Sequence, residues 1–463
     1  MLRRLPDWLF APSRTRGHWL VLAVVLAASL ALQWKVGHGF ASQTNADMTT
    51  SDQAAYLHLA RQNLHFWVPT VTDGARNPLF PWLLTPWYSP DEAQFFAAGK
   101  SVNVAFGMIA SVVLGVYFLL RLPFLPSVVL TILGTYAVIL PISVVVGAEV
   151  VFYPAFFFLW VCFCRLLAVD HLPTYAVGGL VCAIAYLAKP STMLLTLAFF
   201  LLSTVRLRER WKARKLRGLI VGGSLFLVCF LLPVLPRASY ARRNFGDPLQ
   251  NASTYCFWTD SWEEAFAHLD FYSKRRIGEL PESKRPSLGN YWRHHSVAQM
   301  ADRLLRGIPT QARNFFLPEK KLSPKRKPSE KTTLLVSRRG AYPLALLGLT
   351  LVLCLRGRGV QESPEERRAR LAWWTLSALA FALHFLAFAF YAPLAPGARF
   401  IMATYLPVLF ALAVGVESLR KSESLRWREW LYRLTYAALA AALLSQILPL
   451  IRVTAFGEVR GAF

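Results

Sequence analysis

The feature that most constrains this chain is a succession of apolar stretches, several of which approach the ~20 residues that an α-helix needs to cross a bilayer. Of the 463 residues, 55% are hydrophobic and only 17% are charged. A soluble protein of this length needs more charge to cover its surface. The sequence therefore predicts an all-α protein with many membrane-spanning helices.

Hydropathy places about eleven spans along the chain. They are predicted at residues 18–35, 101–120, 126–147, 150–168, 174–187, 191–205, 219–235, 342–355, 371–390, 400–416 and 434–451. The first span has a longer apolar run than a signal peptide and a poor cleavage site, so we expect it to be retained. The fifth and sixth spans meet at "AKPS" (188–191), which fits either a tight hairpin or one broken helix.

The basic residues between the spans predict an orientation, because short cytoplasmic loops are enriched in lysine and arginine. With a cytoplasmic N-terminus, the short basic segments 206–217, 356–370 and 417–433 also fall inside, and the C-terminus falls outside. Two longer segments, which begin near residues 36 and 236, then face outward. Long segments translocate largely regardless of charge. We expect a multi-pass protein of the cell (inner) membrane with its active face in the periplasm.

This topology divides the chain into three parts. Residues 1–235 form an N-terminal membrane module with the first outer loop at 36–100, and residues 340–463 form a C-terminal membrane module. Residues 236–339 form an outer segment, which lacks strand-like alternation and is predicted to consist of helices and loops. Within it, 296–316 has apolar residues at helical spacing and is predicted to be an interfacial helix, on the positions Val297, Met300, Leu304 and Leu305.

Composition also narrows the partners. The net charge of +25 is concentrated in short segments between the spans, which indicates topology signals and contacts with anionic lipids. No aromatic-basic module typical of nucleic-acid binding is visible, so we expect membrane lipids and no nucleic acid. Five of the six cysteines lie in or beside apolar spans, which argues against a disulfide framework. The adjacent His294 and His295 lack a matching carboxylate cluster and are predicted to be surface residues.

The polar residues at the span ends are the candidates for chemistry. On the predicted topology they all lie on the outer face, and they are Asp47, Asp52, Glu149, Lys189, Arg242, Asn244 and Arg399. A carboxylate beside several cations at a membrane surface suits a lipid-linked phosphate, because the cations bind the phosphate oxygens. The carboxylate can accept a proton from an acceptor hydroxyl. The set therefore predicts transfer of a group from a lipid phosphate to an alcohol.

The stretch "TTSDQAAYLHLARQNL" (49–64) predicts a short amphipathic helix just after the first span. Thr50 or Ser51 is expected to cap it, and Asp52 in the first turn is favoured by the helix dipole. Tyr56 and Ala60 follow Asp52 on one face, while Leu57 and Leu64 line an apolar side. Taken alone, this pattern also fits an ordinary capped surface helix.

Together with "DGARNPLFPWLL" (73–84), this stretch resembles the first outer loop of GT-C glycosyltransferases of the protein-mannosyltransferase and aminoarabinose-transferase kind. The matching positions are Asp52, Tyr56, Ala60, Arg76, Pro78, Leu79, Phe80 and Pro81. Further similarities are Glu149 before an aromatic-rich span, "LAKPSTMLL", "RRNFGDP" and "ARFIMATYLPVLFALAVG". The resemblance therefore extends from the first predicted span to the tenth.

The resemblance implies a polyprenyl-phosphate sugar donor, a lipid, glycan or protein acceptor, and roles for individual residues. Asp52 would be the general base or would orient the acceptor, and Glu149 would position donor sugar or acceptor. Arg76, Lys189, Arg242 and Arg399 would bind the lipid phosphate, with Tyr56 and Asn244 as further substrate contacts. Gln53 stands where many relatives have a second acidic residue. Asp47 is therefore a rival for the catalytic role, and a divalent cation is the one cofactor left open.

Other interpretations stay open at this point. Each basic candidate also fits a residue that anchors a helix at the lipid headgroups, and Glu149 also fits a solvated turn. The whole chain also fits a transporter or flippase, although its spans are nearly free of charge and transporters usually carry polar or broken helices near the midplane. A glycan polymerase or ligase, or a non-catalytic relative, are the further alternatives.

Overall fold

The computed structural model describes residues 10, 15–42, 44–49, 52–212, 216–274, 279, 281–316, 341–355, 364–395, 397–421 and 426–455. Within these residues every regular element is a helix and no strand occurs, so the predicted all-α class is confirmed. The expected capping residues Thr50 and Ser51 lie outside the described residues.

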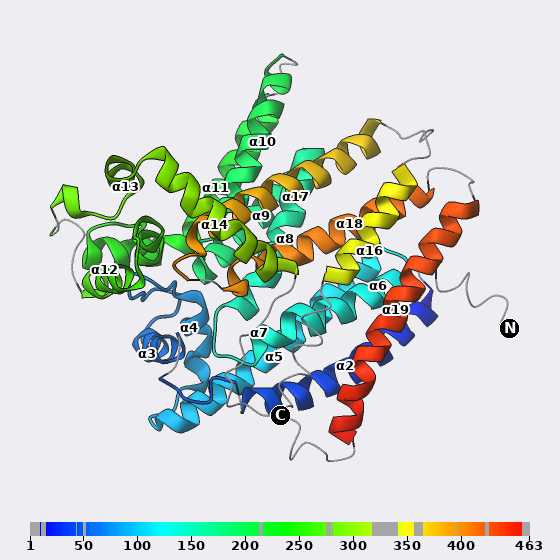
Figure 1. Cartoon of the computed structure of the whole chain (residues 1–463), viewed down its shortest axis with the longest axis horizontal. Coiled ribbons are helices and arrows are strands. Elements are labelled where there is room, and N and C mark those ends of the chain that lie inside the picture. Colours follow the sequence, from blue (N-terminus) through cyan, green and yellow to red (C-terminus); the bar gives the residue numbers. More distant parts are fainter. Residues whose placement is uncertain are drawn as a thin grey trace.

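Long helices form the body of the molecule (Figure 1). They are α2 (Arg16–Ala41), α5 (Glu92–Arg121), α6 (Phe124–Leu133) continued by η3 (Gly134–Ile139) and α7 (Leu140–Ser143), α8 (Glu149–Ala168), α9 (Leu172–Ala188), α10 (Thr192–Lys212), α11 (Leu216–Phe245), α16 (Ala341–Leu355), α17 (Pro364–Tyr391), α18 (Tyr405–Lys421) and α19 (Arg426–Ala455). In the part of the chain that the structure describes, six helices are long and apolar enough to cross a membrane, and four further apolar helices are shorter. The protein is thus membrane-embedded, and the number of eleven spans stays a prediction.

Short helices cover one end of this body (Figure 1). The first outer loop contains α3 (Gln53–Asn63), α4 (Leu79–Leu84) and η2 (Thr85–Trp87). The described residues of the second outer segment form η4 (Ala252–Trp258), α12 (Trp262–Lys274), η6 (Glu282–Lys284), α13 (Leu288–His294) and α14 (Val297–Phe316). The predicted character of this segment, helices joined by loops, is confirmed for these residues. Two more short turns, η7 (Ala398–Phe400) and η8 (Met402–Thr404), link α17 to α18.

Helix α8 occupies the centre of the body. Its side chains Phe152, Phe156, Phe157 and Trp160 are fully buried and belong to one continuous apolar core. A helix that is apolar on all sides is stable only when neighbours or lipid surround it. Helices α5, α9, α10 and α17 all pack against α8. This arrangement brings the start of α8, at Glu149, beside the ends of α9 and α17.

Several helix ends differ from the hydropathy prediction. Helix α5 begins at Glu92, because the Asp91 side chain accepts hydrogen bonds from the backbone N–H groups of Ala93 (2.9 Å) and Gln94 (3.1 Å). Helix α11 continues through two prolines to Phe245. Between α9 and α10, the "AKPS" junction is a sharp turn in which Lys189 is extended. Polar residues that hydropathy excludes from a span thus extend helices beyond the predicted spans.

The predicted interfacial helix forms as α14, but it is not a free surface helix. Its Gly307 side packs against the end of α17 so closely that a Cβ on Gly307 would overlap the carbonyl oxygen of Ala389. Val297 and Leu305 are exposed on the other side. Close approach of helix backbones at small residues is typical of helices that pack within or beside membranes. The outer segment is thereby fixed to the end of α17.

Candidate active site

Asp52 binds two arginines that lie far from it in the sequence. Its Oδ1 accepts hydrogen bonds from both Nη2 (2.7 Å) and Nε (3.2 Å) of Arg76, so one edge of the guanidinium faces a single carboxylate oxygen. Its Oδ2 accepts a hydrogen bond from Nη1 of Arg399 at 3.0 Å. The carboxylate therefore joins the first outer loop to the turn between α17 and α18.

Glu149 lies in the same cluster. Its Oε1 is 2.5 Å from the Nζ of Lys189 and 3.8 Å from Nη1 of Arg399. Because a single nitrogen of Arg399 reaches both Asp52 and Glu149, the two carboxylates are close neighbours. The structure thus brings together Asp52, Arg76, Glu149, Lys189 and Arg399, from four separate parts of the chain.

A tight turn before Arg76 fixes its position. The Asp73 carboxylate accepts hydrogen bonds from the backbone N–H groups of Ala75 (2.9 Å) and Arg76 (2.7 Å), and its other oxygen binds Nη1 of Arg76 at 2.7 Å. Gly74 has φ 79°, a conformation that glycine adopts without strain. The Thr72 hydroxyl donates to the carbonyl oxygen of Arg76 at 2.5 Å. The guanidinium is consequently held in place by this turn as well as by Asp52.

Lys189 and Arg399 are held by turns at helix ends. Lys189 ends α9 in an extended conformation, and its carbonyl accepts a hydrogen bond from the Thr192 hydroxyl (2.9 Å) as α10 begins. The buried Tyr153 of α8 donates its hydroxyl proton to the carbonyl oxygen of Arg399 at 2.6 Å. Both cationic groups lie over the ring of Phe400, Lys189 at 6.0 Å and Arg399 at 5.2 Å from its centre. The backbone of each residue is therefore fixed by a hydrogen bond, and its cationic group lies at the cavity.

The charges in the cluster control its proton affinities. Burial raises the pKa of Asp52, but the positive charges of Arg399 and Arg76 outweigh burial and lower it to about 2. Burial lowers the pKa of Arg76, and the neighbouring Asp73 and Asp52 more than restore it, so it lies above its usual value. Burial and the charge of Glu149 raise the pKa of Tyr56 well above its ordinary range. At neutral pH the cluster therefore contains ionised carboxylates, fixed cations and a neutral tyrosine.

A cavity of about 1220 Å³ opens beside this cluster. One end is charged and is lined by Asp52, Asp73, Arg76, Lys189 and Arg399. The other walls are mostly aromatic or aliphatic and include Phe257, Trp258, Trp262, Phe266, Leu288, Trp292 and Phe390. These walls come from the outer segment and from α17, which α14 holds together. An amphiphile with an anionic head and an apolar body matches this distribution.

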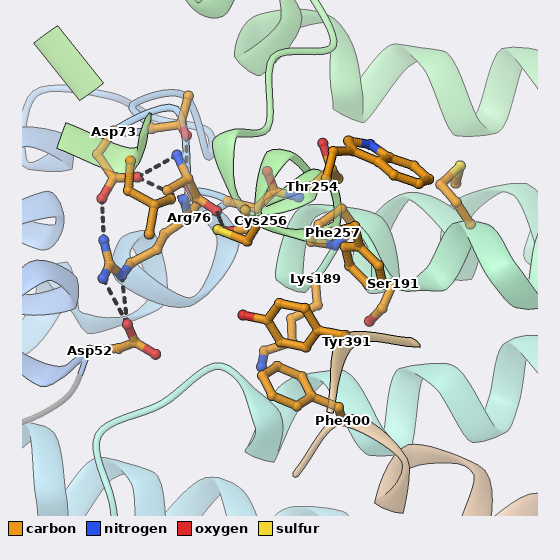
Figure 2. A pocket seen from close by; sticks show the side chains of 18 of the residues that line it. Asp52, Asp73, Arg76, Lys189, Ser191, Thr254, Cys256, Phe257, Tyr391 and Phe400 are labelled. Carbon is orange, nitrogen blue, oxygen red and sulfur yellow. Dashed lines mark hydrogen bonds and ion pairs between the residues drawn. The ribbon is translucent and has the colours of Figure 1, made fainter. Parts of the chain in front are cut away.

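Tyr391, at the end of α17, was not among the sequence candidates. Its ring packs between Phe257 (centroids 5.0 Å apart) and Phe400 (5.5 Å). Figure 2 shows Asp52 and Arg76 on one side of the space and Tyr391 and Phe400 on the other, with the Tyr391 hydroxyl turned toward Asp52. No hydrogen bond joins this hydroxyl to another residue within the described chain. It is therefore placed to donate to a bound molecule.

The remaining sequence candidates have different surroundings. Tyr56 is buried and lines the cavity, and Asn244 lines it from the end of α11. Glu149 contacts the cluster from behind and is not part of the cavity lining. Arg242 is exposed and lies outside the lining, because it points away from the face of α11 that carries Asn244. The structure therefore does not bring Arg242 into the charged cluster, and its contact with phosphate stays a prediction.

Asp47 also lies outside the cavity. Its side chain is exposed and accepts hydrogen bonds from the backbone N–H and the hydroxyl of Thr49, both at 2.8 Å, which lower its pKa. Asp52, by contrast, precedes α3 and uses its carboxylate for the two arginines instead of capping the helix. Leu64, expected on the apolar side of α3, lies after the end of the helix and is exposed. The geometry separates the two rival aspartates.

Gln53, at the position of the second acidic residue in many relatives, turns away from the cavity. Its amide nitrogen donates to the carbonyl oxygens of Asn45 (3.0 Å) and Asp47 (3.2 Å), and its amide oxygen accepts from the N–H of Val146 (3.2 Å). A carboxylate there could not make the two donations. In the part of the chain that the structure describes, no group of three metal-binding side chains occurs.

Asp73 carried a signal that sequence reasoning passed over. An aspartate followed by glycine favours a turn in which the carboxylate accepts N–H groups two and three residues on. That turn is what orients Arg76. Tyr391 carried no such signal, because it belongs to an aromatic run at the end of a span, where most side chains serve packing.

Comparison with protein-family models, with curated proteins and with solved structures gave no match. The functional interpretation therefore depends on the geometry and chemistry of the site itself.

Proposed function

We propose that this protein is a membrane glycosyltransferase of the GT-C kind, which transfers a sugar from a polyprenyl-phosphate donor to an acceptor hydroxyl at the outer face of the membrane. One observation carries the proposal. Ionised carboxylates and fixed cations from four parts of the chain meet at one end of a large cavity whose other walls are apolar and aromatic. A lipid-linked sugar phosphate has the same division between an anionic head and an apolar body.

The proposed topology has about eleven spans with a cytoplasmic N-terminus. It is supported by the meeting of four segments that hydropathy assigns to the same side: the residues after α2, before α8, after α9 and after α17. Alternation of the long helices would put all four on the same side, which is the outer side if the N-terminus is cytoplasmic as proposed. The positive-inside rule then assigns the basic segments at the opposite ends to the cytoplasm.

In the proposed complex, the donor phosphate lies between Lys189, Arg399 and Arg76. Arg399 is the most accessible of the three, with 44% of its side chain exposed, and it can turn from Asp52 to a phosphate oxygen. Planar guanidinium groups bind phosphate through two parallel hydrogen bonds. Ligand pockets usually enclose roughly 300–1,000 Å³, so a cavity of about 1220 Å³ has space for the donor head and part of an acceptor.

Donor binding would also prepare Asp52 to act as a base. Paired with two arginines, the carboxylate holds protons weakly, because its pKa is about 2. A phosphate that binds the same guanidinium groups offsets part of their positive charge, and the pKa of Asp52 rises as a result. The carboxylate becomes more basic only when the donor is in place, which favours transfer over random proton exchange.

The proposed step is a displacement at the anomeric carbon of the sugar. The acceptor oxygen forms a new bond to this carbon, and the bond from the carbon to the phosphate oxygen breaks. The electron pair of the broken bond leaves with polyprenyl phosphate, and Asp52 takes the acceptor proton. Lys189 and Arg399 stabilise the added negative charge on the leaving phosphate.

Reconstituted protein tests the proposal directly. Proteoliposomes receive a panel of polyprenyl-phosphate sugars labelled in the sugar, together with a membrane extract that supplies acceptors. The proposal expects label to move covalently to an acceptor while unlabelled polyprenyl phosphate accumulates. A flippase would leave the donor chemically intact and only move it between leaflets. If no donor in the panel is consumed although the protein moves it across the bilayer, the transferase proposal is wrong.

A further inference from the structure

A second unusual surface lies in the first outer loop, at residues that do not line the charged cavity. Residues 64–68, here called the aromatic loop, follow α3 and read "LHFWV". Trp67 is 95% exposed, and Leu64, Phe66 and Val68 are exposed as well. Four large apolar side chains in five residues are costly to keep in water.

The conformation of this loop is fixed by hydrogen bonds at its base. The buried Asn63 donates from its amide nitrogen to the carbonyl oxygens of Leu59 (2.8 Å) and Val71 (3.1 Å). Its amide oxygen accepts from the N–H groups of Thr70 (3.2 Å) and Val71 (3.0 Å). The chain before and after the loop is therefore clamped by one side chain, and the exposure of the loop is a built feature.

An apolar groove of about 530 Å³ adjoins the loop. Among the described residues, no aspartate, glutamate, lysine or arginine lines this groove. The lining residues are Leu64, His65, Phe66, Trp67, Trp82, Leu83, Thr85, Pro86, Trp87 and Phe106. The indole N–H of Trp82 donates to the carbonyl oxygen of Phe66 at 3.1 Å, which joins the two walls. Trp87 packs edge-on against Phe106 of α5, with centroids 6.4 Å apart.

The position of Phe106 along α5 gives the depth of the groove. Helix α5 ends at Arg121. A hydrocarbon core ~30 Å thick that begins near this arginine extends about 20 residues toward the outer face. Phe106, fifteen residues before Arg121, then lies inside the outer boundary of that core. Ile109 and Val113, further along the same helix, are exposed apolar residues that would face lipid. The groove is thus continuous with a lipid-facing surface.

We infer that the aromatic loop enters the outer leaflet, with Trp67 at the headgroup boundary and the hydrocarbon chain of a bilayer lipid in the groove. Tryptophan prefers this boundary, because its ring is apolar and its N–H is polar. The inference depends on the membrane location of the chain and not on the proposed reaction. It gives the first outer loop a second function, which is to fix the height of the reaction site above the bilayer through lipid contact.

A fluorescent label reports whether position 67 contacts lipid. The variant Trp67→Cys carries an environment-sensitive fluorophore, in full-length protein reconstituted in phosphatidylcholine vesicles. The matched control is Ser283→Cys, an exposed position of η6 in the outer segment. The unsubstituted protein gives the background from the native cysteines. Because Trp67 is almost fully exposed, its replacement leaves folding intact, and thermal unfolding of both variants checks this.

We expect the label at position 67 to emit at shorter wavelength than the label at 283. A nitroxide on the lipid chain should quench it several-fold more strongly, and soluble iodide should quench it less. Equal emission and equal iodide quenching at both positions would overturn the inference. Shielding from iodide without lipid quenching would mean that protein covers the loop, which also overturns it. If polyprenyl phosphate abolishes the lipid quenching, the occupant is polyprenyl and not a bilayer lipid.

Discussion

Two charged clusters contain arginines that donate hydrogen bonds to different kinds of acceptor. In the cavity cluster, Arg76, Lys189 and Arg399 bind the side-chain carboxylates of Asp52 and Glu149. In the second cluster, Arg303 of α14 donates to the carbonyl oxygens of Phe390 (2.9 Å) and Thr259 (2.7 Å) and to the hydroxyl of Tyr291 (2.8 Å). Its one carboxylate partner in the described contacts, Asp260, is further away, at 3.5 Å. Its guanidinium also lies 4.4 Å from the centre of the Phe390 ring.

The difference indicates which cluster can exchange its partners for a ligand. The carbonyls of Phe390 and Thr259 cannot move away from Arg303 without disrupting the end of α17 and the end of η4, and only 11% of the Arg303 side chain is exposed. The Arg399 side chain is 44% exposed, and its carboxylate partners each keep a second cation if it leaves. The Arg303 cluster therefore joins the outer segment to the membrane module, while the cavity cluster is suited to bind an anion.

The largest expected effect is on the rate of sugar transfer, and it differs between the two aspartates at the start of the first loop. Asp52→Asn should lower sugar transfer by about 1,000-fold, because a positioned general base usually contributes roughly 10²–10⁴-fold. Asp47→Asn should change transfer less than about twofold, because its side chain is exposed, lies outside the cavity lining and accepts hydrogen bonds from Thr49. Initial rates from labelled donor, at equal amounts of protein, measure both.

Both asparagine variants preserve side-chain size, but Asp52→Asn also removes ion pairs, so transfer rates are compared per folded molecule. Thermal unfolding in detergent should be similar for Asp47→Asn and the unsubstituted protein. An unaffected rate for Asp52→Asn would remove Asp52 from the reaction, and a large loss in Asp47→Asn alone would transfer the role to the rival residue.

The next prediction compares the loss of one arginine from each cluster, in stability and in transfer rate. Arg303→Met should lower the free energy of unfolding by roughly 3 kcal/mol, because hydrogen bonds to charged groups are worth about 1.5–3 kcal/mol and buried acceptors lose their donor. Arg399→Met should lower stability less than Arg303→Met does, since Asp52 keeps Arg76 and Glu149 keeps Lys189. Transfer per folded molecule should fall about 100-fold in Arg399→Met only.

Denaturation monitored beside transfer rates distinguishes these expectations. Arg399→Lys supplies a matched variant that keeps the positive charge but loses the planar guanidinium. Its transfer rate should lie between those of the unsubstituted protein and Arg399→Met. Equal stability losses for Arg303→Met and Arg399→Met would show that the two clusters have the same structural function.

The same comparison shows what sequence reasoning could reach. Hydropathy and loop charge predicted that Asp52, Glu149, Lys189 and Arg399 lie at span ends on one side of the membrane, and the structure places them in contact. Such reasoning gives the height of a residue along a helix axis but not its direction around the axis. Arg242 shows the limit, because it shares the height of Asn244 and yet lies outside the cavity lining.

The Arg303 cluster was beyond sequence reasoning for a related reason. Its contacts depend on the close approach of α14 to α17 at Gly307, and an isolated glycine in a helical pattern does not identify its partner. His295, predicted to be a surface residue, in fact stacks on Tyr291 (3.9 Å between ring centres) and binds Asp260 at 2.8 Å. Long-range packing of this kind has no local signature.

A smaller effect concerns the pH dependence of stability. Because the pKa of Asp52 falls from 3.8 to about 2 on folding, its ion pairs stabilise the protein above about pH 4, and this contribution is lost as the pH falls toward 2. The contribution is about 2 kcal/mol, since one pKa unit corresponds to about 1.4 kcal/mol. The difference in unfolding free energy between the unsubstituted protein and Asp52→Asn should be constant from about pH 5 to 8 and shrink below about pH 4.

Isothermal denaturation at several pH values measures this difference. Asn cannot titrate, so the pH-dependent part of the difference belongs to Asp52 and to the arginines that respond to it. A difference that stays constant down to about pH 2 would mean that the carboxylate is not ion-paired in the folded protein.

The smallest effect tests whether Tyr391 belongs to the cavity cluster or only to the aromatic packing beside it. The Tyr391 ring contacts Phe257 and Phe400, while its hydroxyl faces Asp52 (Figure 2). Tyr391→Phe keeps the ring and removes only the hydroxyl, so stability should be unchanged. A lost hydrogen bond of about 1 kcal/mol corresponds to a roughly fivefold weaker interaction with substrate. The Michaelis constant for the donor should rise by that factor if the bond forms in the ground state, whereas kcat should fall if it forms only in the transition state.

Tyr291→Phe provides the matched control in the Arg303 cluster, where the hydroxyl donates to Asp260 at 2.8 Å and accepts from Arg303. There the same deletion should lower stability and leave both kinetic constants unchanged. If instead Tyr291→Phe changed the kinetic constants and Tyr391→Phe changed only stability, the Arg303 cluster and not the cavity cluster would bind the ligand.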